Sequence, residues 1–121
     1  MIGGAEIEPR RGGTYTAPFA EIWDCVTSQI RSRKHWDLVY ADEELGMFTV
    51  VCRSRFPRGA DDLTVWVRLD EYGLTCLEVG SSHREGKTSD SARSRRIDEL
   101  LRSVETAVGP GRLVRRTGDA S

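Results

Sequence analysis

The sequence predicts an α+β domain in which two helices cover one face of an antiparallel sheet of four to five strands, in the order β-α-β-β-β-β-α. One observation is the stretch 61–82, where two runs of alternating apolar and polar residues are separated by residues 71–73, the pattern of a β-hairpin. The other is the helical spacing of apolar residues in two segments, about 18–33 and 89–108. We therefore expect the hairpin to form the centre of the sheet.

The sequence of the N-terminal third predicts a flexible arm, a strand and a helix. Residues 1–12 combine glycines, a proline and charges, which indicates a flexible arm ahead of a single domain at 13–108. A short edge strand is expected at 13–17 and a helix over 18–33. Pro18 suits the first turn of that helix because it lacks an N–H, and Glu21 complements the positive end of the helix dipole. The apolar residues of the helix are Phe19, Ile22, Trp23, Val26 and Ile30.

Two further strands are expected at 36–41 and 47–55, joined by a turn at 42–46. Pro57 and Gly59 punctuate the stretch 56–62, so we expect a loop there that leads into the central hairpin. The small, polar and basic stretch 80–89 is expected to be a connection to the last helix, with Ser89 as its N-cap. Gly109 ends this helix, and 109–121 reads as a basic tail with too little apolar content to pack.

The first strand of the central hairpin has two different faces. Trp66 and Arg68 alternate with an apolar set, so they should lie on the sheet face that the helices do not cover. The apolar set is Leu63, Val65, Val67 and Leu69. An open sheet face that carries an aromatic residue is a candidate binding surface.

Composition excludes several classes of function. The 18 basic and 19 acidic residues give a net charge of −1, which argues against nucleic acid as a partner. No stretch has the ~20 apolar residues that a membrane-spanning helix needs, and residues 1–10 lack the features of a signal peptide. We therefore expect a soluble, cytoplasmic protein.

The cysteines and histidines do not form a recognisable metal or catalytic motif. Cys25, Cys52 and Cys76 contain no C-x-x-C pair, so we expect reduced and mostly buried thiols. His35 and His83 lack a second histidine or a cysteine at metal-ligand spacing. The sequence therefore predicts no metal site, no cofactor and no catalytic residues.

The connection before the last helix contains a candidate anion site, because the free N–H groups at the start of a helix attract negative charge. Its residues are His83, Arg84, Lys87, Thr88 and Ser89. A solvated connection with no ligand is the alternative interpretation. The Gly86-Lys87-Thr88 sequence does not have the glycine spacing of a Walker A motif, so nucleotide hydrolysis is not predicted.

Two resemblances to known families add to this interpretation. The stretch YTAPFAEIWDCV, residues 15–26, resembles the first strand and helix of helix-grip proteins of the polyketide-cyclase or START-like kind. That resemblance implies an apolar ligand enclosed between a curved sheet and a long C-terminal helix. Phe19, Ile22, Trp23, Val26 and Leu101 would line such a cavity, or would form the core itself.

The second resemblance rests on a Phe-Pro pair, an Asp-Asp pair, a segment with serine, arginine and glycine, and an Arg-Ile pair in the last helix. These residues are Phe56, Pro57, Asp61, Asp62, Ser81, Arg84, Gly86, Arg96 and Ile97. Over about 15–105 the chain is similar in these residues to the uncharacterised domain of unknown function 1499 family. Ser89 and Arg93 stand where that family has an aspartate and an asparagine, which implies an altered polar site. The resemblance implies a fold and no reaction.

From these residues we expect a non-catalytic interaction domain, an accessory subunit that binds another protein through the open sheet face and the basic tail. The candidate partner-binding residues are Trp66, Arg68, Arg112, Arg115 and Arg116. One alternative is a binder of a small apolar ligand, or a cyclase-like enzyme, with a helix-grip cavity. A second alternative is an anion or phosphate sensor that uses the connection before the last helix.

Overall fold

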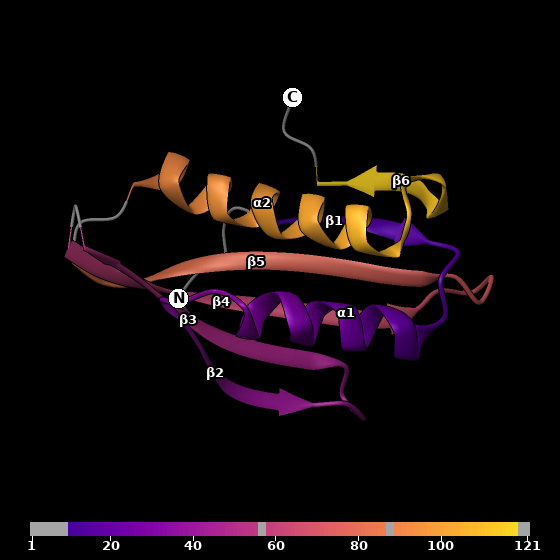
Figure 1. The fold of residues 1–121 in the computed structure, drawn as a ribbon, viewed down its shortest axis with the longest axis horizontal. Helices are drawn as coiled ribbons and strands as arrows, with labels where there is room; N and C mark the ends of the chain where they lie inside the picture. Colours follow the sequence, from indigo (N-terminus) through magenta and orange to yellow (C-terminus); the bar gives the residue numbers. More distant parts are fainter. Residues whose placement is uncertain (1–9, 56–57, 87–88, 119–121) are drawn as a thin grey trace, which may run out of the picture.

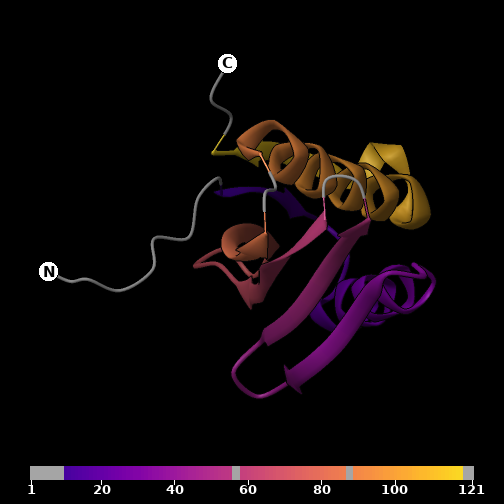
Figure 2. The same cartoon turned by 90° about the vertical axis from the view of Figure 1, so that its left-hand side faces the viewer.

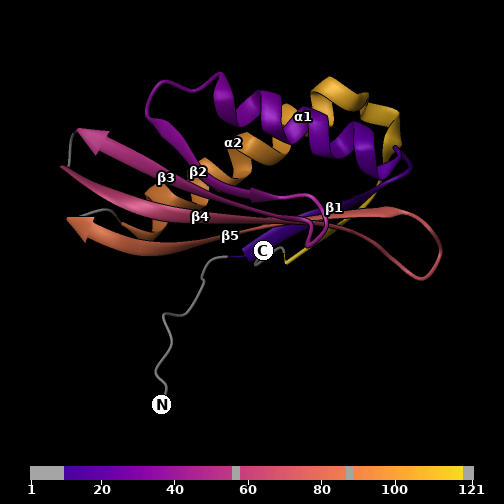
Figure 3. The same cartoon turned by 90° about the horizontal axis from the view of Figure 1, so that it is seen from below.

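A computed structural model, which describes residues 10–55, 58–86 and 89–118, contains a six-stranded antiparallel sheet with both helices on one face (Figures 1 and 3). The elements are β1 (Arg10–Tyr15), α1 (Phe19–Arg31), β2 (Trp36–Asp42), β3 (Met47–Arg55), β4 (Arg58–Leu69), β5 (Thr75–Gly86), α2 (Asp90–Val108), η1 (Pro110–Arg112) and β6 (Leu113–Thr117). The predicted α+β class is confirmed. The predicted number of strands, four to five, is too low.

The strands lie in the order β2-β3-β4-β5-β1-β6, and each neighbouring pair is antiparallel. The central hairpin is confirmed as β4 and β5. Its turn forms because Asp70 Oδ1 accepts hydrogen bonds from the backbone N–H groups of Tyr72 and Leu74, while Gly73 takes a φ of 79°. The two helices contact one another and lie on the same side of the sheet (Figure 2).

The central strands are longer than the sequence indicates. The stretch 58–62, expected to be a loop, belongs to β4, and residues 80–86, expected to be a connection, belong to β5. Both predictions were wrong, because the small and polar residues of these segments form paired strands instead of loops. The backbones of these segments are paired, with Gly59 opposite both Ser54 and Gly86. Phe56, Pro57, Lys87 and Thr88 lie outside the described residues.

The C-terminal segment is not a tail throughout, which corrects the prediction for 109–121. Leu113–Thr117 forms strand β6 on the edge of β1, with Gly13 opposite Arg116 and Thr14 opposite Arg115. Leu113 packs against the core, and the free edge of β1 provides the hydrogen-bonding partner that the local sequence does not reveal. The first strand likewise begins at Arg10, inside the predicted arm 1–12.

Apolar side chains fill the space between the helices and the sheet. Trp23 of α1 stacks on Phe48 of β3 with ring centroids 3.9 Å apart, and Phe19 stacks on Trp23 at 5.7 Å. The remaining buried apolar residues come from both helices and the inner face of the strands. They include Ile22, Val26, Ile30, Val50, Leu63, Val65, Val67, Leu77, Val79, Ile97, Leu100 and Val104. The helical spacing read from the sequence is therefore the spacing of the core.

The N-cap of the second helix is as predicted. Ser89 has extended backbone angles, and its Oγ accepts a hydrogen bond of 3.1 Å from the backbone N–H of Ala92. At the other end, Gly109 is the C-cap, with a φ of 109° that a side chain would strain. These two caps fix the length of α2.

Strand β6 can be tested with two adjacent residues. Leu113→Ala should lower the free energy of unfolding by about 1–2 kcal/mol, because the side chain packs against the core. The control Val114→Ala should change it by less than about 0.5 kcal/mol, because Val114 is 51% exposed. Urea unfolding measures both values. Equal effects would contradict the assignment of 113–117 to the sheet.

Alkaline pH should destabilise the protein through two buried groups. Burial raises the pKa of Tyr15 to about 12, with Glu105 adding to the shift, and burial also raises the pKa of Cys52 to about 12. The unfolded chain loses these protons at lower pH, so the folded state holds more protons between about pH 9 and 12, and the free energy of unfolding falls as pH rises through that range.

Tyr15→Phe isolates the tyrosine contribution. The difference in unfolding free energy between wild type and Tyr15→Phe should be constant at neutral pH and should shift against wild type above about pH 10. Urea unfolding at a series of pH values measures this difference. A difference that stays constant to pH 11 would contradict the burial of the hydroxyl.

Candidate functional site

The sheet face that points away from the helices has an uncharged centre. Four side chains from β3 and β4 form it: Met47 lies opposite Trp66, and Thr49 lies opposite Thr64. All four are partly exposed, and they alternate with buried core residues of the same strands. No described helix covers this surface (Figure 3), which we call the open face.

Three ion pairs surround the centre of the open face. Asp62 pairs with Arg84 at 2.7 Å, Asp37 pairs with Arg53 at 3.2 Å, and Glu78 pairs with Arg10 at 2.6 Å. The three carboxylates come from β4, β2 and β5. The charges at the rim are therefore largely balanced within the protein.

Trp66 takes part in a stacked group on the open face. The guanidinium of Arg10 lies 4.6 Å from the centroid of the indole ring, and Glu78 Oε1 accepts a hydrogen bond from the same guanidinium. Arg68, two residues along β4, is exposed on the same face and lies opposite Cys76. The predicted placement of Trp66 and Arg68 away from the helices is confirmed.

The C-terminal arginines do not form one surface with Trp66. Arg112 donates two hydrogen bonds to the carboxylate of Glu21, at 2.7 and 3.0 Å, and so ties η1 to α1. Arg116 pairs with Glu105 of α2 at 2.9 Å. Arg115 is exposed and lies opposite Thr14, which places it on the open face near its β6 edge. Of the three, Arg115 alone extends the predicted surface.

A buried carboxylate lies on the opposite, helix-covered face of β4. Asp61 is 1% exposed, and its Oδ2 accepts a hydrogen bond from Nη1 of Arg96 in α2. Arg93 Nη1 lies 3.9 Å from Asp61 Oδ1, and His83 Nδ1 of β5 lies 3.5 Å from the same oxygen. We call these four residues the Asp61 cluster. It joins α2 to β4 and β5.

The Asp61 cluster attaches α2 to the sheet. The carboxylate of Asp61 is only 1% exposed and already accepts a hydrogen bond from Arg96. The neighbouring Cys52 thiol has its pKa raised to about 12, chiefly by burial, so it stays protonated and unreactive at neutral pH. Sequence reasoning placed Asp61 at the end of a loop and missed the cluster. The one feature of the sequence that could have revealed it is that Asp61 occupies the same alternating positions as the apolar residues of β4, which face the helices.

The predicted anion site is divided by these contacts. His83 lies against Asp61, Arg84 pairs with Asp62, and the Oγ of Ser89 is used by the helix cap. An anion there would compete with two carboxylates of the protein. Lys87 and Thr88 lie outside the described residues.

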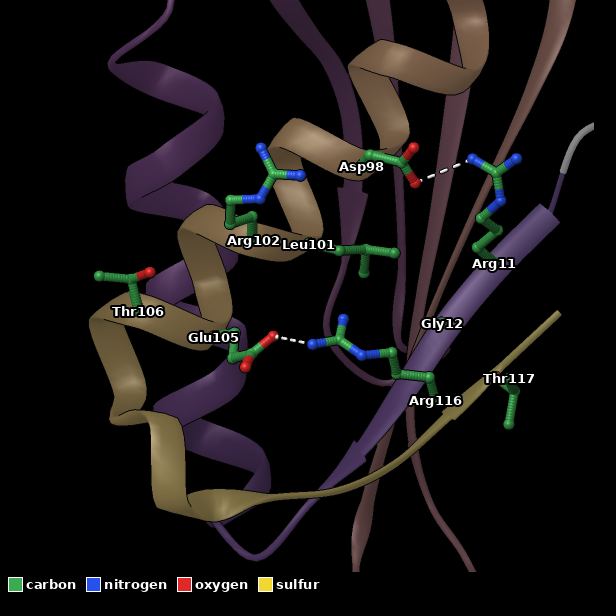
Figure 4. A pocket seen from close by; sticks show the side chains of 9 residues that line it. All are labelled: Arg11, Gly12, Asp98, Leu101, Arg102, Glu105, Thr106, Arg116 and Thr117. Carbon is green, nitrogen blue, oxygen red and sulfur yellow. Dashed lines mark hydrogen bonds and ion pairs between the residues drawn. The ribbon is translucent and has the colours of Figure 1, made fainter. Parts of the chain in front are cut away.

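A groove of about 560 Å³ runs between α2 and the strands β1 and β6 (Figure 4). Two ion pairs cross it: Arg11 contacts Asp98 at 2.8 Å and Arg116 contacts Glu105 at 2.9 Å. Leu101 lies between the two pairs in this view. Four of the five charged groups in this groove are paired with one another, and Arg102 adds one positive charge.

Within the described residues, no three histidine, cysteine, aspartate or glutamate side chains lie close enough to hold a metal ion. Neither described helix is long and apolar enough to cross a membrane. The three cysteines are free thiols.

No protein-family model matches the chain, and a search of the curated proteins finds no significant match. The resemblances to the domain of unknown function 1499 and to helix-grip proteins therefore remain predictions. The function has to be inferred from the surfaces described above.

Substitutions at the adjacent residues Asp61 and Asp62 compare the stability contributed by an ion pair on the helix-covered face with that of an ion pair on the open face. Asp61→Asn should lower the free energy of unfolding by about 3–5 kcal/mol, because it leaves the partly buried guanidinium of Arg96 without its carboxylate. The control Asp62→Asn breaks an exposed pair and should cost no more than about 1 kcal/mol. Urea unfolding at neutral pH measures both. A smaller loss for Asp61→Asn than for Asp62→Asn would contradict the attachment role of the cluster.

Proposed function

We propose that this protein is a non-catalytic interaction domain that binds a protein partner on the open face of its sheet. The observation that carries the proposal is an uncharged centre, Met47, Thr49, Thr64 and Trp66, inside a rim of ion pairs on a face that no described helix covers. Protein interfaces share this arrangement, with charge depleted at the centre and polar residues at the rim.

The composition of the open face favours a protein over a small molecule. Tryptophan, methionine and arginine are enriched in protein interfaces, and tryptophan and arginine are the residues that most often dominate binding energy. Arg10 of the rim stacks on Trp66 at the centre of this face, and Glu78 already holds the guanidinium in place. Because these side chains are already held in place before a partner binds, less conformational entropy is lost on binding.

The ion pairs of the rim would determine the orientation of the bound partner more than its affinity. Its ion pairs are formed within the protein, so a partner need not supply a counter-charge to each one. Arg68 and Arg115 are exposed on the same face and form no ion pair among the described residues. An acidic segment of the partner beside these two arginines would fix the register of the complex.

The alternative of an enclosed apolar ligand has less support. A helix-grip cavity would lie between the sheet and α2, where Leu100, Ile97, Val104 and their neighbours are fully buried in one packed cluster. A ligand of useful size would have to displace these side chains. The open face requires no such rearrangement.

Two substitutions on the open face test the proposal. Trp66→Ala should weaken the complex by about 30-fold or more, the effect of losing roughly 2 kcal/mol at an interface hot spot. Thr64→Glu should weaken it as well, because a charge at the centre would be buried against the partner. The measurement is recovery of the partner with the tagged protein from its own organism, followed by titration of the purified pair.

Tyr72→Ala is the matched control, since this residue is an aromatic side chain in the β4–β5 turn, 77% exposed and outside the centre of the open face. It should leave the affinity unchanged. Thermal unfolding must first show that each variant is folded, with a midpoint close to that of wild type. Full affinity in folded Trp66→Ala and Thr64→Glu would overturn the proposal.

A further inference from the structure

The end of the sheet farthest from the β4–β5 turn contains a basic cavity, which shares Arg53 with the rim of the open face. It has a volume of about 780 Å³ and lies where β3 leads into β4, beside the end of β5. Its lining includes Arg53, Arg55, Arg58, His35 and one acidic residue, Glu85. The volume lies within the range of small-molecule sites in proteins.

The described residues balance the positive charge of this cavity only in part. Arg53 Nε contacts the carboxylate of Asp37 at 3.2 Å. Arg55 and Arg58 form no ion pair with any residue in the described part of the chain, and both are exposed. Once Asp37 is counted against Arg53, the three arginines and Glu85 leave a formal charge of +1, without His35.

The register of the hairpin concentrates this charge. Arg55 lies directly opposite Arg58 in the β3–β4 pair, and Arg53, two residues earlier, is on the same face of β3. Like charges directly opposite one another in a sheet are destabilising. Gly59, opposite Ser54, also lines the cavity and has no side chain to fill it. A bound anion would relieve the repulsion and use several N–H donors at once.

We propose that this cavity binds a phosphate or diphosphate group of a small molecule. The planar guanidinium donates two parallel hydrogen bonds to phosphate oxygens, and arginine is the side chain best suited to that geometry. A diphosphate has enough charge to engage Arg55 and Arg58 together. Glu85 and Gly86 of the stretch 83–89 also line this cavity, but His83 and Arg84 of the predicted anion site do not, and both of those contact carboxylates.

The test is thermal unfolding of the full chain at low ionic strength with inorganic phosphate, pyrophosphate or ADP. Ligand bound to the folded state raises the unfolding midpoint, and we expect a rise of about 2–5 °C with millimolar pyrophosphate. A response to ADP at a lower concentration than to pyrophosphate would identify a nucleotide as the source of the diphosphate. Either response supports the site, and no response to any of the three would overturn it.

The double variant Arg55→Gln, Arg58→Gln should lose this response. Without ligand its unfolding midpoint should equal or exceed that of wild type, because the like-charge pair is removed. The control Arg31→Gln, Arg95→Gln also removes two exposed arginines, from α1 and α2, and should keep the full response. An equal loss in both variants, or an equal effect of sodium chloride at matched ionic strength, would show general screening and overturn the proposal.

Discussion

The contact between Asp61 of β4 and Arg96 of α2 is the interaction on which the arrangement of the layers depends. Burial of apolar area alone defines the position of a helix on a sheet less sharply than a buried ion pair does, because the hydrophobic effect has no direction. A buried carboxylate that must meet guanidinium groups of α2 defines that position. With α2 fixed in this way and α1 packed beside it, both helices lie on one face of the sheet (Figure 3).

The same constraint leaves two surfaces available for binding. The open face has Trp66 and Thr64 at an uncharged centre, while the cavity at the end of β3 and β4 has Arg55 and Arg58 without counter-ions among the described residues. Neither surface contributes to the core, so each can vary in sequence at little cost in stability. The buried charge of Asp61 attaches α2 to the sheet, whereas the charges of Arg55 and Arg58 are exposed to solvent.

The elements with a regular spacing of apolar residues could be predicted from the sequence. The elements whose contacts are with residues far away in the sequence could not. The helices and the central hairpin follow from alternating and helical spacing, and Ser89 follows from its capping chemistry. Strand β6 was missed because its strongest apolar contact, through Leu113, depends on the edge of β1, about a hundred residues earlier. The role of Asp61 was missed for the same reason, since Arg96 is 35 residues away.

The central claim is that the open face, and not the helix face, contacts a protein partner. A photo-crosslinking amino acid at Thr64 and another at Ala107, an exposed position on α2, test this most directly in the native organism. The account predicts a single discrete crosslinked protein from Thr64 and none from Ala107. Crosslinking of a discrete partner from Ala107, with none from Thr64, would contradict it.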